Sequence, residues 1–155
     1  MRCSRLDHDT GRRVVGTVLA GLALLAGGCG NAKRDFRVEQ LNPLITRASE
    51  QRAQLASLLR SSRPHHARDA RILRSGIVAL GVTMRRLAVL HPPQGTEAKF
   101  KRYTRANTVL LASLSRFVDA FASGNLLRVR RADQQTRAAV AAANRAQTSL
   151  QHALR

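Results

Sequence analysis

Residues 96–125, TEAKFKRYTRANTVLLASLSRFVDAFASGN, decide the fold of this 155-residue chain. One series of mostly apolar positions in this segment recurs at gaps that alternate between three and four residues: Phe100, Tyr103, Asn107, Leu110, Leu114, Phe117 and Phe121. This spacing puts all seven on one face of an α-helix, as in helices that pack in left-handed bundles. Thr96 is expected to cap the start of this helix, and Gly124 to end it in a left-handed backbone conformation.

Three further segments carry a helical period. The first runs from about Asp35 to Arg60 and has its apolar stripe at Leu41, Leu44, Ala48, Leu55 and Leu58, flanked by Ile45 and Leu59. The second runs from about His66 to Leu90, with Leu73, Ile77, Leu80, Met84 and Leu87. The last runs from about Leu126 to Leu154 and has a mostly alanine face: Thr136, Ala139, Val140, Ala143, Ala146, Leu150 and Leu154. Short connections make sequential helices antiparallel, so the chain is predicted to be an all-α, up-down-up-down four-helix bundle.

A proline in the first helical segment and two glycines in the second affect how these helices form. Pro43 either kinks the first helix, or is the first residue of a helix that Asn42 caps. Gly76 and Gly81 each weaken the second helix by about 1 kcal/mol relative to alanine. They would also allow a neighbouring helix to approach closely.

The segment before the helices has the parts of a secretory signal. Arg12 and Arg13 precede an uncharged stretch, residues 14–28, which ends in Leu25-Ala26-Gly27-Gly28 and is followed directly by Cys29. This ending resembles the lipobox of bacterial lipoproteins, although the family more often has leucine where Ala26 stands. The resemblance implies cleavage between Gly28 and Cys29 and attachment of a diacylglyceryl group to the Cys29 thiol. It divides the chain into a signal peptide (1–28), a lipidated tether (29–34) and a helical domain (35–155).

Two other interpretations of this segment stay open. The uncharged run 14–32 has 19 residues, which is close to the roughly 20 needed to span a bilayer, but five of them are glycines. Alternatively, the segment is an ordinary secretory signal and Cys29 is incidental. Cys3 would be removed with the signal, so a lipidated mature chain would have no disulfide. The export route also stays open.

The layout as a whole resembles small four-helix lipoproteins of high-GC Gram-positive bacteria. The turns that carry the likeness are Leu90-His91-Pro92-Pro93, before the third helix, and Ser123-Gly124-Asn125, before the fourth. The resemblance implies a position on the extracytoplasmic face of the cell membrane, together with the bundle fold. It implies no mechanism.

The chain is strongly basic, with 27 Lys and Arg against 9 Asp and Glu and a net charge of +18. Residues 1–28 contain four basic and two acidic residues, so their removal leaves +16. Such a charge attracts polyanions, namely anionic lipids, cell-wall polymers or nucleic acid. The candidate contacts are Arg68, Arg71, Arg74, Arg128 and Arg131. A high-GC genome is a competing explanation for the arginine excess.

Nothing in the sequence indicates catalysis, a metal or a cofactor. No nucleophile motif, phosphate loop or dinucleotide fingerprint is present. His65, His66, His91 and His152 form no metal-binding or haem-binding pattern. Nucleic-acid binding is disfavoured because the aromatic residues belong to the helical stripe and are not free to stack on bases.

The sequence therefore favours a non-enzymatic envelope lipoprotein whose basic bundle contacts anionic lipids or wall polymers. One alternative is a small-molecule or metal-binding module, with Tyr103, Asn107 and Met84 around the ligand. In that stripe, Asn107 is expected to fix helix register and the Tyr103 hydroxyl to reach solvent at the end of the bundle. Another alternative is an interaction subunit with an exposed apolar patch; Val78, Val82 and Val89 lie off the main stripe of their helix.

Overall fold

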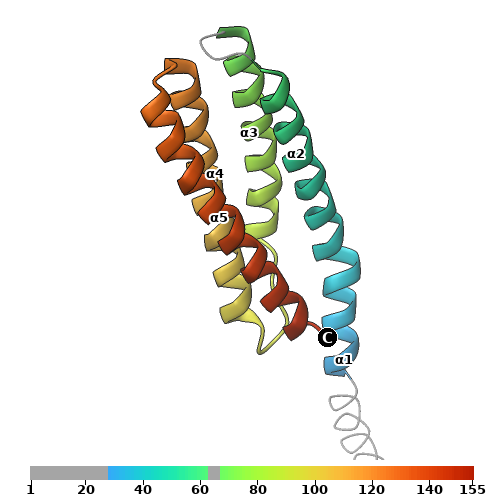
Figure 1. The fold of residues 1–155 in the computed structure, drawn as a ribbon. Coiled ribbons are helices and arrows are strands. Elements are labelled where there is room, and N and C mark those ends of the chain that lie inside the picture. The colour runs from blue at the N-terminus through green and yellow to red at the C-terminus, as the bar shows by residue number, and fades with distance from the viewer. Residues whose placement is uncertain (1–27, 63–66) are drawn as a thin grey trace, which may run out of the picture.

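The computed structural model describes residues 28–62 and 67–155, which form a bundle of four long helices (Figure 1). The first is continuous over α1 (Gly28–Asp35), the π-helix η1 (Phe36–Leu41) and α2 (Asn42–Ser61). The other three are α3 (Ala67–Ala88), α4 (Glu97–Ser123) and α5 (Leu126–Ala153). The described residues contain no strand, and the predicted all-α four-helix bundle is confirmed.

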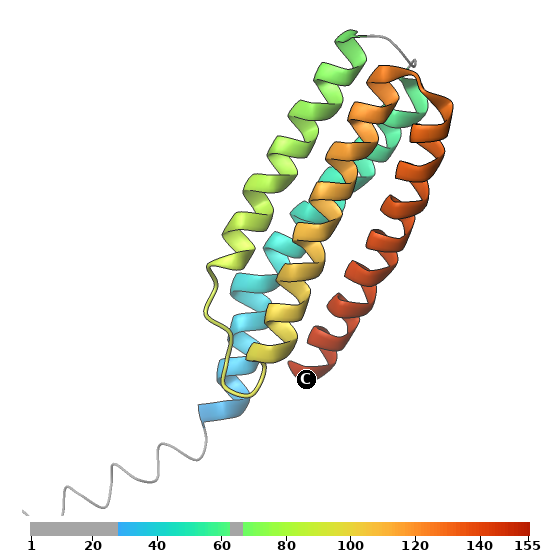
Figure 2. The same cartoon turned by 90° about the vertical axis from the view of Figure 1, so that its left-hand side faces the viewer.

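Sequential helices run antiparallel, so the bundle is a rod with two distinct ends (Figures 1 and 2). The proximal end contains α1, the start of α4 and the end of α5. The Phe36 and Phe100 rings meet there edge-on, with centroids 5.9 Å apart, and Arg37 Nη1 donates to the Leu154 carbonyl at 3.5 Å. The distal end is where α2 and α4 end and where α3 and α5 begin. None of the helices in the described part of the chain has the length and apolar character needed to span a bilayer.

The core forms along the predicted stripes. The whole α3 stripe is buried, as are the predicted Leu41, Ile45, Ala48 and Leu55 of the first helix. On α4, Phe100, Tyr103, Asn107, Leu110 and Phe121 of the stripe are buried, whereas Leu114 and Phe117 are only partly covered. Val118 and Ala120, beside Phe121, are buried as well. The buried face is therefore wider than the predicted stripe towards the end of α4.

Alanine residues let α5 lie close against α4. Ala139 and Ala143 are buried and form a small cluster with Leu110 of α4, and Ala146 joins the main core. Towards the proximal end the α5 side chains become larger, and Leu150 and Leu154 are almost fully buried. The narrow apolar face of α5 is therefore sufficient for packing against α4. Where α5 has no leucine, its small alanine side chains allow the two helices to approach closely.

The first helix continues through Pro43, so Pro43 does not begin a separate helix that Asn42 caps. Asn42 does not cap a helix: its N–H bonds to the Arg37 carbonyl, five residues back. Proline lacks an N–H and its ring obstructs the carbonyl four residues before it. The wider π-type turns of η1 lie directly before Pro43, as expected where a helix accommodates such a disruption.

Two other local expectations need correction. The segment 29–34, expected to be a tether, is helical, because α1 begins at Gly28 rather than at Asp35. Thr96 occupies the N-cap position of α4, but its hydroxyl donates to the Pro93 carbonyl at 2.7 Å and caps no helical N–H. The side chain that does cap is Asn125, whose Oδ1 accepts from the Arg128 N–H at 3.1 Å. Gly124 ends α4 with φ of 64°, as predicted.

Gly76 and Gly81 should respond in opposite directions to substitution by alanine. A Cβ at Gly76 would lie 2.6 Å from Leu55 Cδ2, whereas at Gly81 the nearest atom is Arg85 Nη1 at 3.8 Å. Alanine at Gly81 should therefore stabilise the protein by about 1 kcal/mol through helix propensity. At Gly76, overpacking against buried Leu55 costs about 1–3 kcal/mol, which should offset or exceed that gain. Urea unfolding of the two variants tests this; a stabilisation of similar size at both positions would contradict the close approach of α2.

Candidate anion-binding surfaces

The five arginines predicted to contact an anionic partner all lie at the distal end. Arg68, Arg71 and Arg74 are exposed on the first turns of α3. Arg128 and Arg131 are exposed on the first turns of α5. The antiparallel arrangement brings these two turns, far apart in the sequence, to the same end of the rod (Figure 1).

Asp119 near the end of α4 links the two groups of arginines. Its Oδ1 accepts from Arg74 Nη2 of α3 at 2.9 Å. On its other side, Asp119 lines a shallow groove with Arg128 and Arg131 of α5, to which Arg116 also contributes. Both partners of the Arg74–Asp119 pair are more than half exposed, so the pair stabilises the fold by little. We call Arg68, Arg71, Arg74, Arg116, Arg128 and Arg131 the distal arginine cluster.

Sequence reasoning missed Arg116, although a signal was present. Arg116 lies three residues before Asp119, which puts both side chains on the same face of α4. Without the pairing of α4 with α5, nothing indicates that this face adjoins Arg128. Asp133 of α5 pairs with Arg137 at 2.9 Å, one turn further along the same helix.

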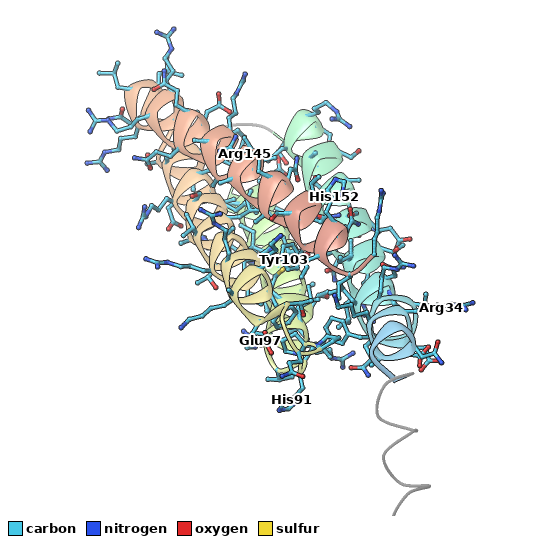
Figure 3. All side chains as sticks on the ribbon, turned by 90° about the horizontal axis from the view of Figure 1, so that it is seen from below. Arg34, His91, Glu97, Tyr103, Arg145 and His152 are labelled. Carbon is cyan, nitrogen blue, oxygen red and sulfur yellow. The ribbon has the colours of Figure 1, made fainter. Side chains whose placement is uncertain are left out.

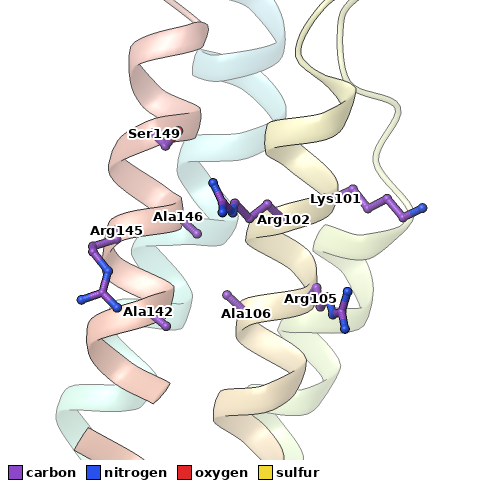
Figure 4. Close-up of a pocket in the computed structure, with 8 residues that line it drawn as sticks. All are labelled: Lys101, Arg102, Arg105, Ala106, Ala142, Arg145, Ala146 and Ser149. Atoms are coloured by element: carbon purple, nitrogen blue, oxygen red, sulfur yellow. The ribbon is translucent and has the colours of Figure 1, made fainter. Parts of the chain in front are cut away.

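A second basic surface, also missed by sequence reasoning, lies between α4 and α5 nearer the proximal end (Figure 4). It is an open groove of about 660 Å³, and its eight lining residues include four cations and no acid: Lys101, Arg102, Arg105, Ala106, Ala142, Arg145, Ala146 and Ser149. We call it the proximal groove. Figure 4 shows Arg102 reaching across the gap between the helices, with the alanine methyl groups facing into it, while Lys101 and Arg105 extend past the other side of α4.

The polar pair Tyr103 and Asn107 lies inside the core. Figure 3 shows Tyr103 within the bundle, and the expectation that its hydroxyl reaches solvent is wrong, since the residue is 1% exposed. The Asn107 amide donates to the Tyr103 carbonyl at 2.9 Å, within its own helix. Among the described residues, the Tyr103 hydroxyl and Asn107 Oδ1 have no hydrogen-bond partner of good geometry. Burial raises the pKa of Tyr103, and nearby Arg52 and Asn107 oppose this shift with smaller effects.

Polar contacts between helices come from residues other than Asn107. Thr83 of α3 donates from Oγ1 to Gln51 Oε1 of α2 at 2.9 Å. Thr136 of α5 donates to the Ser113 carbonyl of α4 at 3.3 Å. Cross-helix hydrogen bonds of this kind favour one alignment of the helices, which is the role the sequence suggested for Asn107.

The remaining candidate residues lie apart from both basic surfaces. Met84 is buried in the core, and neither groove is lined by Met84, Tyr103 or Asn107. His91 and His152 are exposed near the proximal end (Figure 3), and His65 and His66 lie outside the described residues. Within residues 28–62 and 67–155, no group of three His, Cys, Asp or Glu side chains is arranged to hold a metal ion.

Two valines on α3 and one directly after its end are exposed, with 64% of Val78, 39% of Val82 and 71% of Val89 accessible. These are the apolar positions that lie off the main stripe of buried residues.

Comparison of the chain with protein-family models, with curated proteins and with solved structures finds no significant match.

Proposed function

We propose that the protein is a non-enzymatic envelope lipoprotein, held at the extracytoplasmic face of the cell membrane by acylated Cys29, whose distal arginine cluster binds an anionic cell-wall polymer. The observation that carries the proposal is the position of this cluster at the end of the rod opposite to Cys29. The lipobox-like residues Leu25 to Cys29 support the anchor. Two or three acyl chains would hold the protein stably, whereas one chain gives only marginal binding.

The length of the rod separates the distal cluster from the anchoring membrane. Cys29 lies seven residues before Phe36, which is about 10 Å along a helix axis. Phe36 packs beside Phe100, and Asp119 lies a further 19 residues along α4, or about 28 Å. In an upright molecule the centre of the distal cluster is therefore about 40 Å from the level of Cys29.

Electrostatic screening decides which anion the distal cluster can reach. The Debye length is about 8 Å at physiological ionic strength, so 40 Å corresponds to about five screening lengths. At that distance the charge of the anchoring membrane has no appreciable effect on the distal arginines. In an upright rod, the distal arginines are positioned to bind an anionic polymer that lies outside the membrane.

Binding to protein-free and lipid-free cell walls tests the proposal. We expect the purified protein to cosediment with the walls at low salt and to be released at 1 M salt, where the Debye length is about 3 Å. Replacing Arg68, Arg71, Arg128 and Arg131 by glutamine removes four charges. At about 1 kcal/mol per charge, this should weaken binding by about 1,000-fold.

A matched control separates this cluster from net charge alone. Replacing Lys101, Arg102, Arg105 and Arg145 by glutamine removes the same four charges from the proximal groove, and wall binding should stay close to that of the wild type. Equal losses in the two quadruple variants would mean that binding follows total charge. Salt-insensitive binding, or no binding by the wild type, would contradict the proposed partner.

A further inference from the structure

The proximal groove combines features that the distal cluster lacks. Four cations line it and no acid does, whereas Asp119 lies within the distal cluster. None of these four cations takes part in an ion pair found within the described part of the chain. Ala106, Ala142 and Ala146 keep the floor small and apolar, which leaves space between the two helices for a ligand. Ser149 adds a hydroxyl at the edge of this space.

The chemistry of the lining suits a phosphate diester attached to an apolar group. Arginine guanidinium groups bind phosphate through paired N–H donors, and Arg102 reaches into the gap between the helices. A hydroxyl such as that of Ser149 can donate to a phosphate oxygen. The alanine floor has no polar side chain and would contact glycerol or acyl carbons. An anionic phospholipid carries both kinds of group in one molecule.

The position of the groove places it close to the membrane that would hold Cys29. Arg102 lies two residues beyond Phe100, so its level is about 13 Å from that of Cys29 in an upright rod. The headgroup layer of one leaflet occupies about 5–8 Å of this distance. The remaining gap is about one Debye length or less, and a modest tilt towards α4 and α5 would close it. The distal cluster would stay far from the membrane in such an orientation.

From these observations we propose that the proximal groove binds the phosphate headgroup of an anionic phospholipid of the anchoring membrane. This inference rests on the proposed function, because the lipid anchor would bring the groove to the membrane that supplies the phospholipid. The bound headgroup would act as a second attachment point and limit the tilt of the rod. Arg102, which reaches between the helices, contacts the phosphate, and Arg145 on the α5 wall adds a second positive charge to the groove.

Equilibrium binding of a tail-labelled phosphatidylglycerol, followed by fluorescence anisotropy, tests this site. The full protein is kept in neutral detergent micelles, so that binding does not depend on whether Cys29 is acylated. The Arg102→Gln/Arg145→Gln variant should bind about 30-fold more weakly, from two charges at about 1 kcal/mol each. The variant Arg68→Gln/Arg71→Gln, with the same change in charge at the distal end, should bind as the wild type does.

Competition with unlabelled molecules identifies the ligand. Unlabelled phosphatidylglycerol should displace the probe, and phosphatidylcholine and inorganic phosphate should not do so at equal concentration. Displacement by inorganic phosphate with equal efficiency would assign the groove to a free anion, and equal losses in the two double variants would show no specific site. Either result overturns the lipid assignment. Absence of acyl mass on Cys29 would overturn the anchor, while binding in micelles would still report on the groove.

Discussion

Replacing Leu80 by alanine is expected to lower the free energy of unfolding by about 3–5 kcal/mol. Leu80 is fully buried at the middle of the α3 stripe and belongs to the main core cluster. The substitution removes apolar contacts and leaves a cavity that the flanking helices can fill only in part. Because domains of this size have a net stability of about 5–15 kcal/mol, the loss is a large share of the total.

Urea unfolding followed by circular dichroism measures this effect. Val89→Ala is the control: Val89 lies directly after the end of α3 and is 71% exposed, so its truncation should change stability by no more than about 0.5 kcal/mol. Similar losses at Leu80 and Val89 would mean that the α3 stripe does not face the core.

Replacing Cys29 by alanine is expected to abolish incorporation of a labelled fatty acid into the protein in a bacterial host. The thiol is the only group in the proposed lipobox that can form the thioether to diacylglycerol, so no residual labelling should remain. Cys3→Ala is the matched control: Cys3 lies in the segment that would be removed, and labelling should be unchanged. Labelling that persists in the Cys29 variant, or that is lost in the Cys3 variant, would contradict the assigned lipidation site.

The bundle could be predicted from the sequence because the buried residues of each helix recur at helical spacing within one short segment. The α3 stripe from Leu73 to Leu87 and the proximal half of the α4 stripe are buried as expected. Phe121 is buried as expected too, but the partial exposure of Leu114 and Phe117 is not predictable, because local periodicity does not show how closely the neighbouring helices cover each position. Pro43 was equally ambiguous, since the π-type turns that accommodate it have no strong sequence signature.

The basic surfaces depend on contacts between helices, which local patterns do not contain. Arg102 and Arg145 are 43 positions apart, and only the pairing of α4 with α5 makes them line one groove. The five predicted arginines were identified as separate runs on two helices, and their gathering at one end follows from the antiparallel topology. Asn107 illustrates the converse, because its burial was predictable while its hydrogen bond to its own helix was not.

The intact mass of the protein extracted from the membrane fraction shows whether Cys29 is its anchor. Acylation of Cys29 should give a chain of residues 29–155 with the added mass of two or three acyl groups. A membrane-bound chain of all 155 residues with no added mass would contradict it, and would indicate that residues 14–32 span the membrane instead.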